Sequence, residues 1–285
     1  MLRSSKMIIV ILIILLTSFA CSIDMPFSTY QVGKSTSMMV NEPAIESDIP
    51  IDVIIKMAAG KLELSGGAKN LIEGSIEYNV PDLKPTISRN EDIVSIIQDI
   101  SLDSPGIPVG NIVNKWNLQL GNYEMNLVID AGAYDGIIDL SGVPLSSLSV
   151  SDGASSSKIS FNKANPIVME YLNYRTGASN IQLYGLSNAN FKEMKFDGGA
   201  GAYTLDFSGE LKQDCTVNIS SGVSNLKIII PENTSSNILL TGGVNNIYLS
   251  GTWTVEDRQY WTDGDGPNLN ISVDMAVGSL ELVAN

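Results

Sequence analysis

The sequence predicts an all-β fold, specifically a parallel β-solenoid with coils of about 21 residues, and three observations support this prediction. A unit of glycine, a small residue, two turn residues and then alternating apolar positions recurs at 177–183, 222–228 and 243–249. Apolar residues also alternate with polar ones before the glycines, as at 51–57 and 215–219, which places them on one face of a strand. No long segment after the N-terminal region shows the 3.6-residue period of a helix. An antiparallel β-sandwich of the same hairpin-like units is the alternative.

The spacing of the glycines sets the expected size of each coil. From Gly132 the intervals are 21, 24, 24, 21 and 21 residues, followed by one step of 35 residues to Gly278. One pair of strands cannot bury its apolar face alone, whereas stacked copies can, so each coil is expected to pair with the next. Two stretches, 78–114 and 251–267, interrupt the regularity and are expected to be insertions. The glycines that open these units are Gly132, Gly153, Gly177, Gly201, Gly222, Gly243 and Gly278.

The N-terminus has the layout of a secretory signal peptide, which we place at residues 1–20. Arg3 and Lys6 precede an uninterrupted apolar run at 7–16, which is short for a membrane span. A small residue then stands directly before Cys21, an arrangement that resembles the lipobox of bacterial lipoproteins. Lipidation at Cys21 is therefore expected, with ordinary signal cleavage or an uncleaved anchor as the alternatives. It predicts an extracytoplasmic protein whose first partner is the membrane, reached through the N-terminal lipid.

The remaining chain divides into two regions. Residues 21–48 lack clear periodicity and are expected to form a flexible tether. Residues 49–285 are expected to form the β-repeat domain with its two insertions. The only other cysteine, Cys215, lies in an alternating strand pattern and is interpreted as a small buried residue.

Composition argues against several functional classes. Asp and Glu total 31 against 17 for Lys and Arg, so the net charge of −14 disfavours nucleic acid as a partner. The chain contains no histidine, which removes the commonest general base and the commonest zinc ligand. Neither a cofactor nor a metal site is predicted.

A carbohydrate-active enzyme of the β-solenoid type is the main catalytic alternative, because such an enzyme works with paired carboxylates. That mechanism needs acids on neighbouring coils, and from Asp139 onward no two consecutive coils carry an acid at the expected solvent-facing position. The residues read at this position are Glu63, Asp139, Ser160, Gln182, Asp206, Lys227, Tyr248 and Glu281.

The second insertion, 251–267, contains the candidate ligand-binding residues. Aromatic rings on a loop can stack on sugars or anchor an interface, but they can equally fold back and cap a repeat array. Two aspartates in the same loop resemble a fragment of a calcium loop that lacks its further ligands. The candidates are Trp253, Tyr260, Trp261, Asp263 and Asp265.

The stretch from Asp52 to Pro81 and the run 199–209 resemble the toast-rack family of uncharacterised bacterial envelope proteins. This family is similar to the C-terminal domain of cell-wall-active-antibiotics response proteins and to adhesin-like proteins. The resemblance covers about residues 49–285 and implies a stacked β architecture in the bacterial envelope, without catalytic residues to carry over. The expected function is thus a non-catalytic envelope lipoprotein with a structural, adhesive or sensing role, and an envelope protein or a glycan as its further partner. A regulator of an envelope-stress sensor kinase remains a second alternative.

Overall fold

The computed structural model describes residues 32–44, 47–98 and 111–285, and its elements are β-strands apart from two short 3-10 helices, η1 (Pro81–Leu83) and η2 (Leu186–Ala189). The prediction of an all-β fold is confirmed. The strands are β1 (Thr36–Glu42), β2 (Ile51–Ala68), β3 (Ile72–Tyr78), β4 (Thr86–Asn90), β5 (Ile93–Ile97), β6 (Asn114–Gly121), β7 (Met125–Asp139), β8 (Leu145–Ser160), β9 (Met169–Tyr184), β10 (Phe191–Asp206), β11 (Cys215–Ile230), β12 (Ser235–Gly242), β13 (Asn246–Ser250), β14 (Thr254–Glu256), β15 (Gln259–Thr262) and β16 (Asn268–Ala284).

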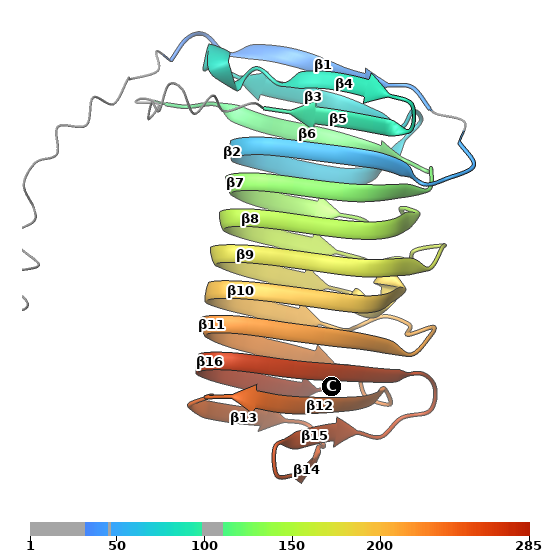
Figure 1. Cartoon of the computed structure of the whole chain (residues 1–285), viewed down its shortest axis with the longest axis vertical. Coiled ribbons are helices and arrows are strands. Elements are labelled where there is room, and N and C mark those ends of the chain that lie inside the picture. Colours follow the sequence, from blue (N-terminus) through green and yellow to red (C-terminus); the bar gives the residue numbers. More distant parts are fainter. Residues whose placement is uncertain (1–31, 45–46, 99–110) are drawn as a thin grey trace, which may run out of the picture.

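The strands form one 16-stranded sheet that is largely parallel, and Figure 1 shows them stacked one beneath the other along the long axis. The long strands β2, β7 to β11 and β16 pair in parallel with their neighbours. The alternative of an antiparallel β-sandwich is therefore wrong.

Each long strand bends near its middle, so that one coil has a first limb before the bend and a second limb after it (Figure 1). In β7 the alternation of buried and exposed residues is interrupted by two exposed residues in succession, Gly132 and Ala133. On each limb, every second side chain points into the space between the two limbs, and this space is the core. Directly paired positions on successive second limbs are Ile137, Lys158, Gln182, Thr204 and Lys227, so the offset between coils is 21 to 24 residues.

A column of glycines runs down the bends: Gly132, Gly153, Gly177, Gly199 and Gly222. An added Cβ atom at Gly153 or Gly222 would lie 2.7 Å from the carbonyl oxygen of the glycine one coil earlier. No side chain fits at that distance, which explains why the sequence repeats glycine here. The bend of β10 lies at Gly199, and the assignment to Gly201 from sequence spacing was wrong by two residues.

The stacking order departs from the chain order at both ends. Strand β2 pairs directly with β7, although β3 to β6 lie between them in the sequence. Strand β16, the last in the chain, lies between β11 and the coil formed by β12 and β13. The expectation that each coil pairs with the next one along the chain is therefore wrong at the two ends, and the outermost C-terminal coil bends at Gly243.

Additional strands cover the N-terminal end of the stack. On the first limb of β2 lies β5, which pairs with β4. These two strands come from the predicted insertion at 78–114, of which residues 99–110 lie outside the described part. On the second limb lie β6, β3 and then β1. Since β1 is a strand of the sheet, the folded part begins before residue 49 and includes part of the expected tether.

The core is continuous along the stack and includes a cluster of aromatic and polar side chains around Asp152. Phe196 stacks on Tyr174 with ring centroids 5.6 Å apart and meets the Tyr203 ring edge-on at 5.0 Å. The buried carboxylate of Asp152 accepts a hydrogen bond from the Tyr174 hydroxyl at 2.9 Å and another from Thr176. Burial and then the neighbouring charged and polar groups raise the pKa of Tyr174. Neither helix of the described residues is long and apolar enough to cross a membrane.

Candidate functional site

The predicted insertion at 251–267 contains a β-hairpin formed by β14 and β15. This hairpin covers β12, the first limb of the outermost C-terminal coil (Figure 1). Strand β15 pairs antiparallel with β12, which places Tyr260 opposite Ile238. Tyr260 is 6% exposed and Ile238 is fully buried. Tyr260 is therefore a core residue that closes the end of the stack, rather than an accessible binding residue.

Trp253 also contributes to closing the core. It lies where the chain passes from β13 to β14, and its ring is partly buried against the core. The indole Nε1 donates a hydrogen bond to the carbonyl oxygen of Ser250 at 3.0 Å. This contact fixes the ring against the preceding strand, so Trp253 is a capping residue in this structure.

Trp261 points the other way. It is the neighbour of Tyr260 on β15, so its side chain lies on the outer face, in register with Asn237 on one side and Thr254 on the other. It lines a depression of about 360 Å³ on this face. The other lining residues are Ser235, Ser236, Asn237, Gln259, Thr262, Asp263 and Asn268.

The lining of this depression combines an apolar aromatic face with polar side chains. A half-buried aromatic ring offers an apolar face, and amide and carboxylate groups around it can hydrogen-bond to hydroxyls. Of the predicted residues, Trp261 and Asp263 are brought together here, whereas Asp265 is exposed and does not line the depression. Within the described ranges, no group of three or more histidines, cysteines or carboxylates is placed to hold a metal ion.

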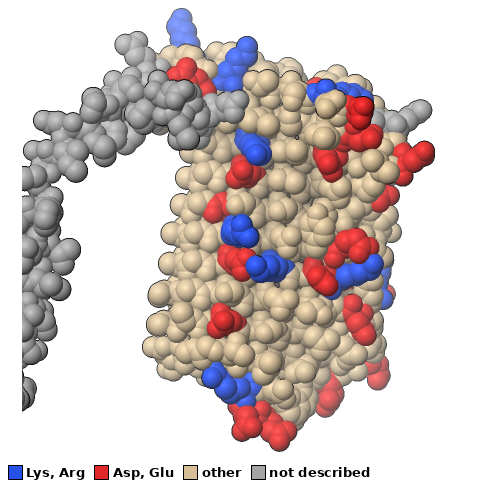
Figure 2. Space-filling view, in the orientation of Figure 1, with Lys and Arg blue, Asp and Glu red and all other residues tan. Residues whose placement is uncertain are grey.

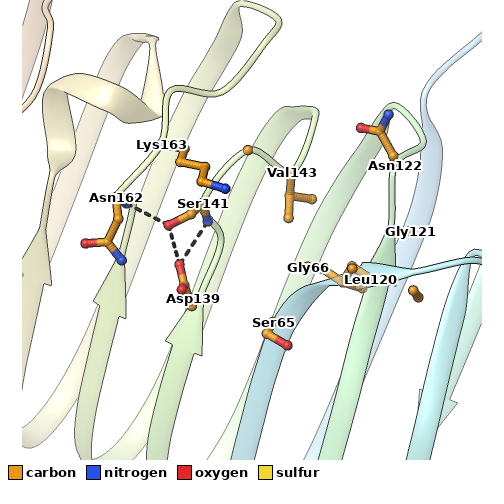
Figure 3. Close-up of a pocket in the computed structure, with 13 residues that line it drawn as sticks. Ser65, Gly66, Leu120, Gly121, Asn122, Asp139, Ser141, Val143, Asn162 and Lys163 are labelled. Atoms are coloured by element: carbon orange, nitrogen blue, oxygen red, sulfur yellow. Dashed lines mark hydrogen bonds between the residues drawn. The ribbon is translucent and has the colours of Figure 1, made fainter.

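A second hollow, not predicted from the sequence, lies where the second limbs of β2 and β7 end (Figure 3). Its volume is about 390 Å³, and its polar lining includes Asp139, Ser141, Asn162 and Lys163. The Asp139 carboxylate accepts hydrogen bonds from the backbone N–H of Ser141 at 3.1 Å and from the hydroxyl of Ser141. The same hydroxyl oxygen accepts a hydrogen bond from the backbone N–H of Asn162 at 2.7 Å, which joins this loop to the next coil.

The hollow continues as an adjoining depression of about 400 Å³ that shares Asn162. There the Lys158 ammonium lies over the Tyr184 ring, 5.2 Å from its centre. The lysine therefore already covers this face of the aromatic ring. The Asp206 carboxylate accepts a hydrogen bond from the backbone N–H of Ser208 at 2.8 Å. The repeated Asp-x-Ser at the end of a second limb could have indicated these turns from the sequence alone.

The two acids of this groove are too far apart for hydrolysis by paired carboxylates. Asp139 is in register with Ser160, and Ser160 is in register with Tyr184. Asp206 follows Leu205, which pairs with Leu183 on the next strand, so three inter-strand steps separate the acids. At about 4.8 Å per step this is about 14 Å, beyond the roughly 5 to 9.5 Å that glycosidases use. The row of positions read from the sequence combined two different registers: Glu63, Gln182 and Lys227 align with Ile137 and Thr204, and not with Asp139, Ser160 and Asp206.

Several polar side chains on the outer faces contact each other from coil to coil. Asn126 donates a hydrogen bond to Asp52 at 2.8 Å and accepts one from Ser147 at 2.8 Å. Lys227 pairs with Glu281 at 2.8 Å on the other limb. Figure 2 shows basic side chains beside acidic ones on the visible face. Such rows are typical of a solvated repeat surface.

The structure describes only one of the two cysteines. Cys21, the predicted lipidation site, lies outside the described residues. Cys215 is buried and free, and burial first and the nearby Asp214 second raise the pKa of its thiol to about 12. A protonated, inaccessible thiol is not a nucleophile at neutral pH.

A comparison with known protein families identifies the family of this chain. It matches the N-terminal domain of toast_rack, DUF2154, over residues 34–170 and 164–229, which is more than half of its length. The protein therefore belongs to the toast-rack family, as the resemblance of its sequence indicated. A search of curated proteins gave no match.

Several solved structures are similar to this chain at low sequence identity. A "putative cell adhesion protein" from Clostridium sporogenes is 21% identical and gives a TM-score of 0.47, with 88% of this chain and 99% of that chain covered. A "putative adhesin" from Bacteroides fragilis is 9% identical with a TM-score of 0.39, covering 87% and 97% of the two chains. Another from Parabacteroides merdae is 9% identical with a TM-score of 0.40, covering 90% and 99%.

Proposed function

We propose that the protein is a bacterial cell-envelope lipoprotein, anchored through Cys21, whose parallel β-solenoid ectodomain is a non-enzymatic adhesive module. Its ligand is a glycan of the envelope or of a neighbouring surface, and Trp261 lies at the centre of the binding site. Membership in the toast-rack family supports this envelope role.

The depression around Trp261 is the observation that carries the proposal. It combines one aromatic face with amide groups of Asn237, Gln259 and Asn268 and the carboxylate of Asp263. Sugars present apolar C–H faces and hydroxyl edges, and this set of groups is complementary to both. The 14 Å separation of the acids in the other groove, about three strand spacings, supports a binding role over hydrolysis.

The point at which the chain enters the stack supports the proposed orientation. Cys21 precedes the first residue of β1, Thr36, by 15 residues, and β1 lies at the N-terminal end of the stack. An anchor at Cys21 keeps that end near the membrane. The hairpin with Trp261 is at the opposite end and would face outward from the cell (Figure 1).

Binding is tested with the full chain in detergent micelles on an array of bacterial glycans. We expect Trp261→Ala to weaken binding to the captured glycans by about tenfold or more, because stacking and its burial are worth about 1.4 kcal/mol or more. Tyr171→Ala is the matched control, since Tyr171 is an exposed aromatic residue (45%) on another coil. Equal binding by Trp261→Ala and wild type, or turnover of a captured glycan, would contradict the proposal.

The anchor is tested by intact mass of protein from the membrane fraction. We expect a mature chain that begins at a diacylglyceryl Cys21 and a Cys21→Ala variant that lacks this modification. An unmodified Cys21 in the wild type would refute the lipoprotein part and leave the binding site unaffected.

A further inference from the structure

The second limb of the outermost C-terminal coil ends in an open strand edge. Strand β13 pairs with β16 on one side, and within the described part of the chain no strand pairs with its other side. All five of its residues, Asn246 to Ser250, are exposed. An edge of this kind presents unpaired backbone N–H and C=O groups and is a template for another strand.

The side chains of β13 that face the core are incompletely covered. Ile247 and Leu249 are in register with Leu280 and Leu282 of β16, which are both fully buried. In β13, however, Ile247 is 38% exposed and Leu249 is 46% exposed. Apolar residues of a core face that remain half exposed mark a surface that a further layer can cover.

The first limb of the same coil shows what such a cover does. Strand β12 carries Ile238 and Leu240 at its core-facing positions, and both are at most 1% exposed. The difference is that β15 pairs with β12 and β14 pairs with β15. The stack therefore extends two strands further on the first limb than on the second, and a notch two strands deep lies next to the hairpin.

We propose that β13 binds an extended strand of another polypeptide, which adds to the sheet in this notch. Alternate apolar side chains of the incoming strand would cover Ile247 and Leu249, and its backbone would satisfy the open edge. Between residues 232 and 265 the chain carries five carboxylates and one guanidinium, Arg258. A strand flanked by lysine or arginine therefore fits best.

The stack extends two strands further on the first limb than on the second, and this difference disfavours a second copy of the chain as the occupant. A two-fold copy joined through β13 would place its own β12 at the level of β15, which is already occupied. A head-to-tail copy that places its β1 against β13 would bring its β4 to the level of β14. A free strand or a hairpin meets neither obstacle. This docking does not depend on the glycan site or on the lipid anchor.

The test uses the full chain in detergent micelles and the synthetic peptide Lys-Lys-Val-Thr-Ile-Thr-Val-Thr-Lys-Lys. A peptide of the same composition with its apolar residues clustered, Lys-Lys-Thr-Thr-Thr-Val-Val-Ile-Lys-Lys, controls for charge. We expect the alternating peptide to bind and to slow amide hydrogen exchange in β13. Leu249→Lys should weaken binding by about tenfold, because it places a charge on the covered face. Leu239→Lys is the control, since Leu239 is 40% exposed on the outer face of the covered limb.

Three results would overturn the proposal. The first is binding of both peptides alike, and the second is an unchanged affinity of Leu249→Lys with a circular dichroism spectrum and melting temperature like those of wild type. The third is a dimer in sedimentation whose β13 amides are already protected without peptide, which would make a second copy the occupant. None of these results bears on the glycan array, so the two proposals fail separately.

Discussion

The middle coils and the two ends of the molecule follow different rules. From β7 to β11 each coil pairs in parallel with both neighbours, the glycine column runs through every bend, and the core residues are almost completely buried. At the ends the chain leaves this order, antiparallel strands appear, and ten of the fourteen large apolar residues that are exposed in the described part of the chain are found there. These ten are Met39, Ile49, Ile93, Ile112, Leu239, Ile247, Tyr248, Leu249, Val255 and Val277.

This difference separates stability from recognition. The middle coils bury a continuous core that supports a rigid stack, and their outer polar groups engage each other. The C-terminal end carries both candidate binding features, the Trp261 depression and the open edge of β13. Substitutions in the middle should therefore cost stability, and substitutions at this end should mainly change binding.

The largest effect is expected from Phe196→Ala. Phe196 is fully buried between the rings of Tyr174 and Tyr203 in a middle coil, so its removal leaves a cavity and should lower the free energy of unfolding by about 4 kcal/mol. Trp253→Ala, at the C-terminal end, should cost only about 1 kcal/mol because this ring is already partly exposed. Urea unfolding followed by circular dichroism measures both. Equal losses would mean that the ends stabilise the stack as much as the middle.

A somewhat smaller loss is expected from Gly177→Val. The added side chain would overlap the carbonyl oxygen of Gly153 and push two middle coils apart, at a cost of about 3 kcal/mol. Gly243→Val is the matched substitution at the outermost bend, where the Cβ atom lies 2.9 Å from the carbonyl oxygen of Ala276 and the coil has a neighbour on one side only. We expect that variant to lose about 1 kcal/mol, measured in the same way. A tolerated Gly177→Val would refute the steric explanation of the column.

The smallest effect concerns Cys215, at the start of β11. Its folded pKa of about 12 exceeds the ordinary value of 9.0, so the folded state resists ionisation of the thiol. The contribution of this thiol to the free energy of unfolding is fully present below about pH 9. It is lost as the pH rises towards 12, because the thiol of the unfolded chain ionises first. At pH 8 we expect no reaction with Ellman's reagent until urea unfolds the protein. Fast labelling of the folded protein would show that this coil opens locally.

The sequence pattern predicted the middle coils well because alternation and glycine spacing repeat there without interruption. It could not give the stacking order at the C-terminal end, since β12 with β13 and β16 carry the same two-limbed pattern. Periodicity shows that a strand belongs to the stack, but its neighbour is decided by long-range pairing. Glycine spacing also cannot choose between Gly199 and Gly201, which are two residues apart and therefore preserve the alternation.

The candidate residues of the hairpin show the same limit. Tyr260 and Trp261 are adjacent, so once they lie on a strand one must face the core and the other the surface. The choice depends on the register with β12, which places Tyr260 opposite Ile238. Composition indicated an aromatic loop, and only the pairing distinguished Trp261 in the depression from the residues that close the core.

Amide hydrogen exchange of β16 and β13 tests the arrangement of the C-terminal end most directly. The structure places β16 between β11 and the outermost coil, so its amides should exchange as slowly as those of the middle coils although it ends the chain. Those of β13, at the open edge, should exchange much faster. Slow exchange in β13 together with fast exchange in β16 would mean that the coils stack in chain order, and it would contradict both the fold described at this end and the open edge.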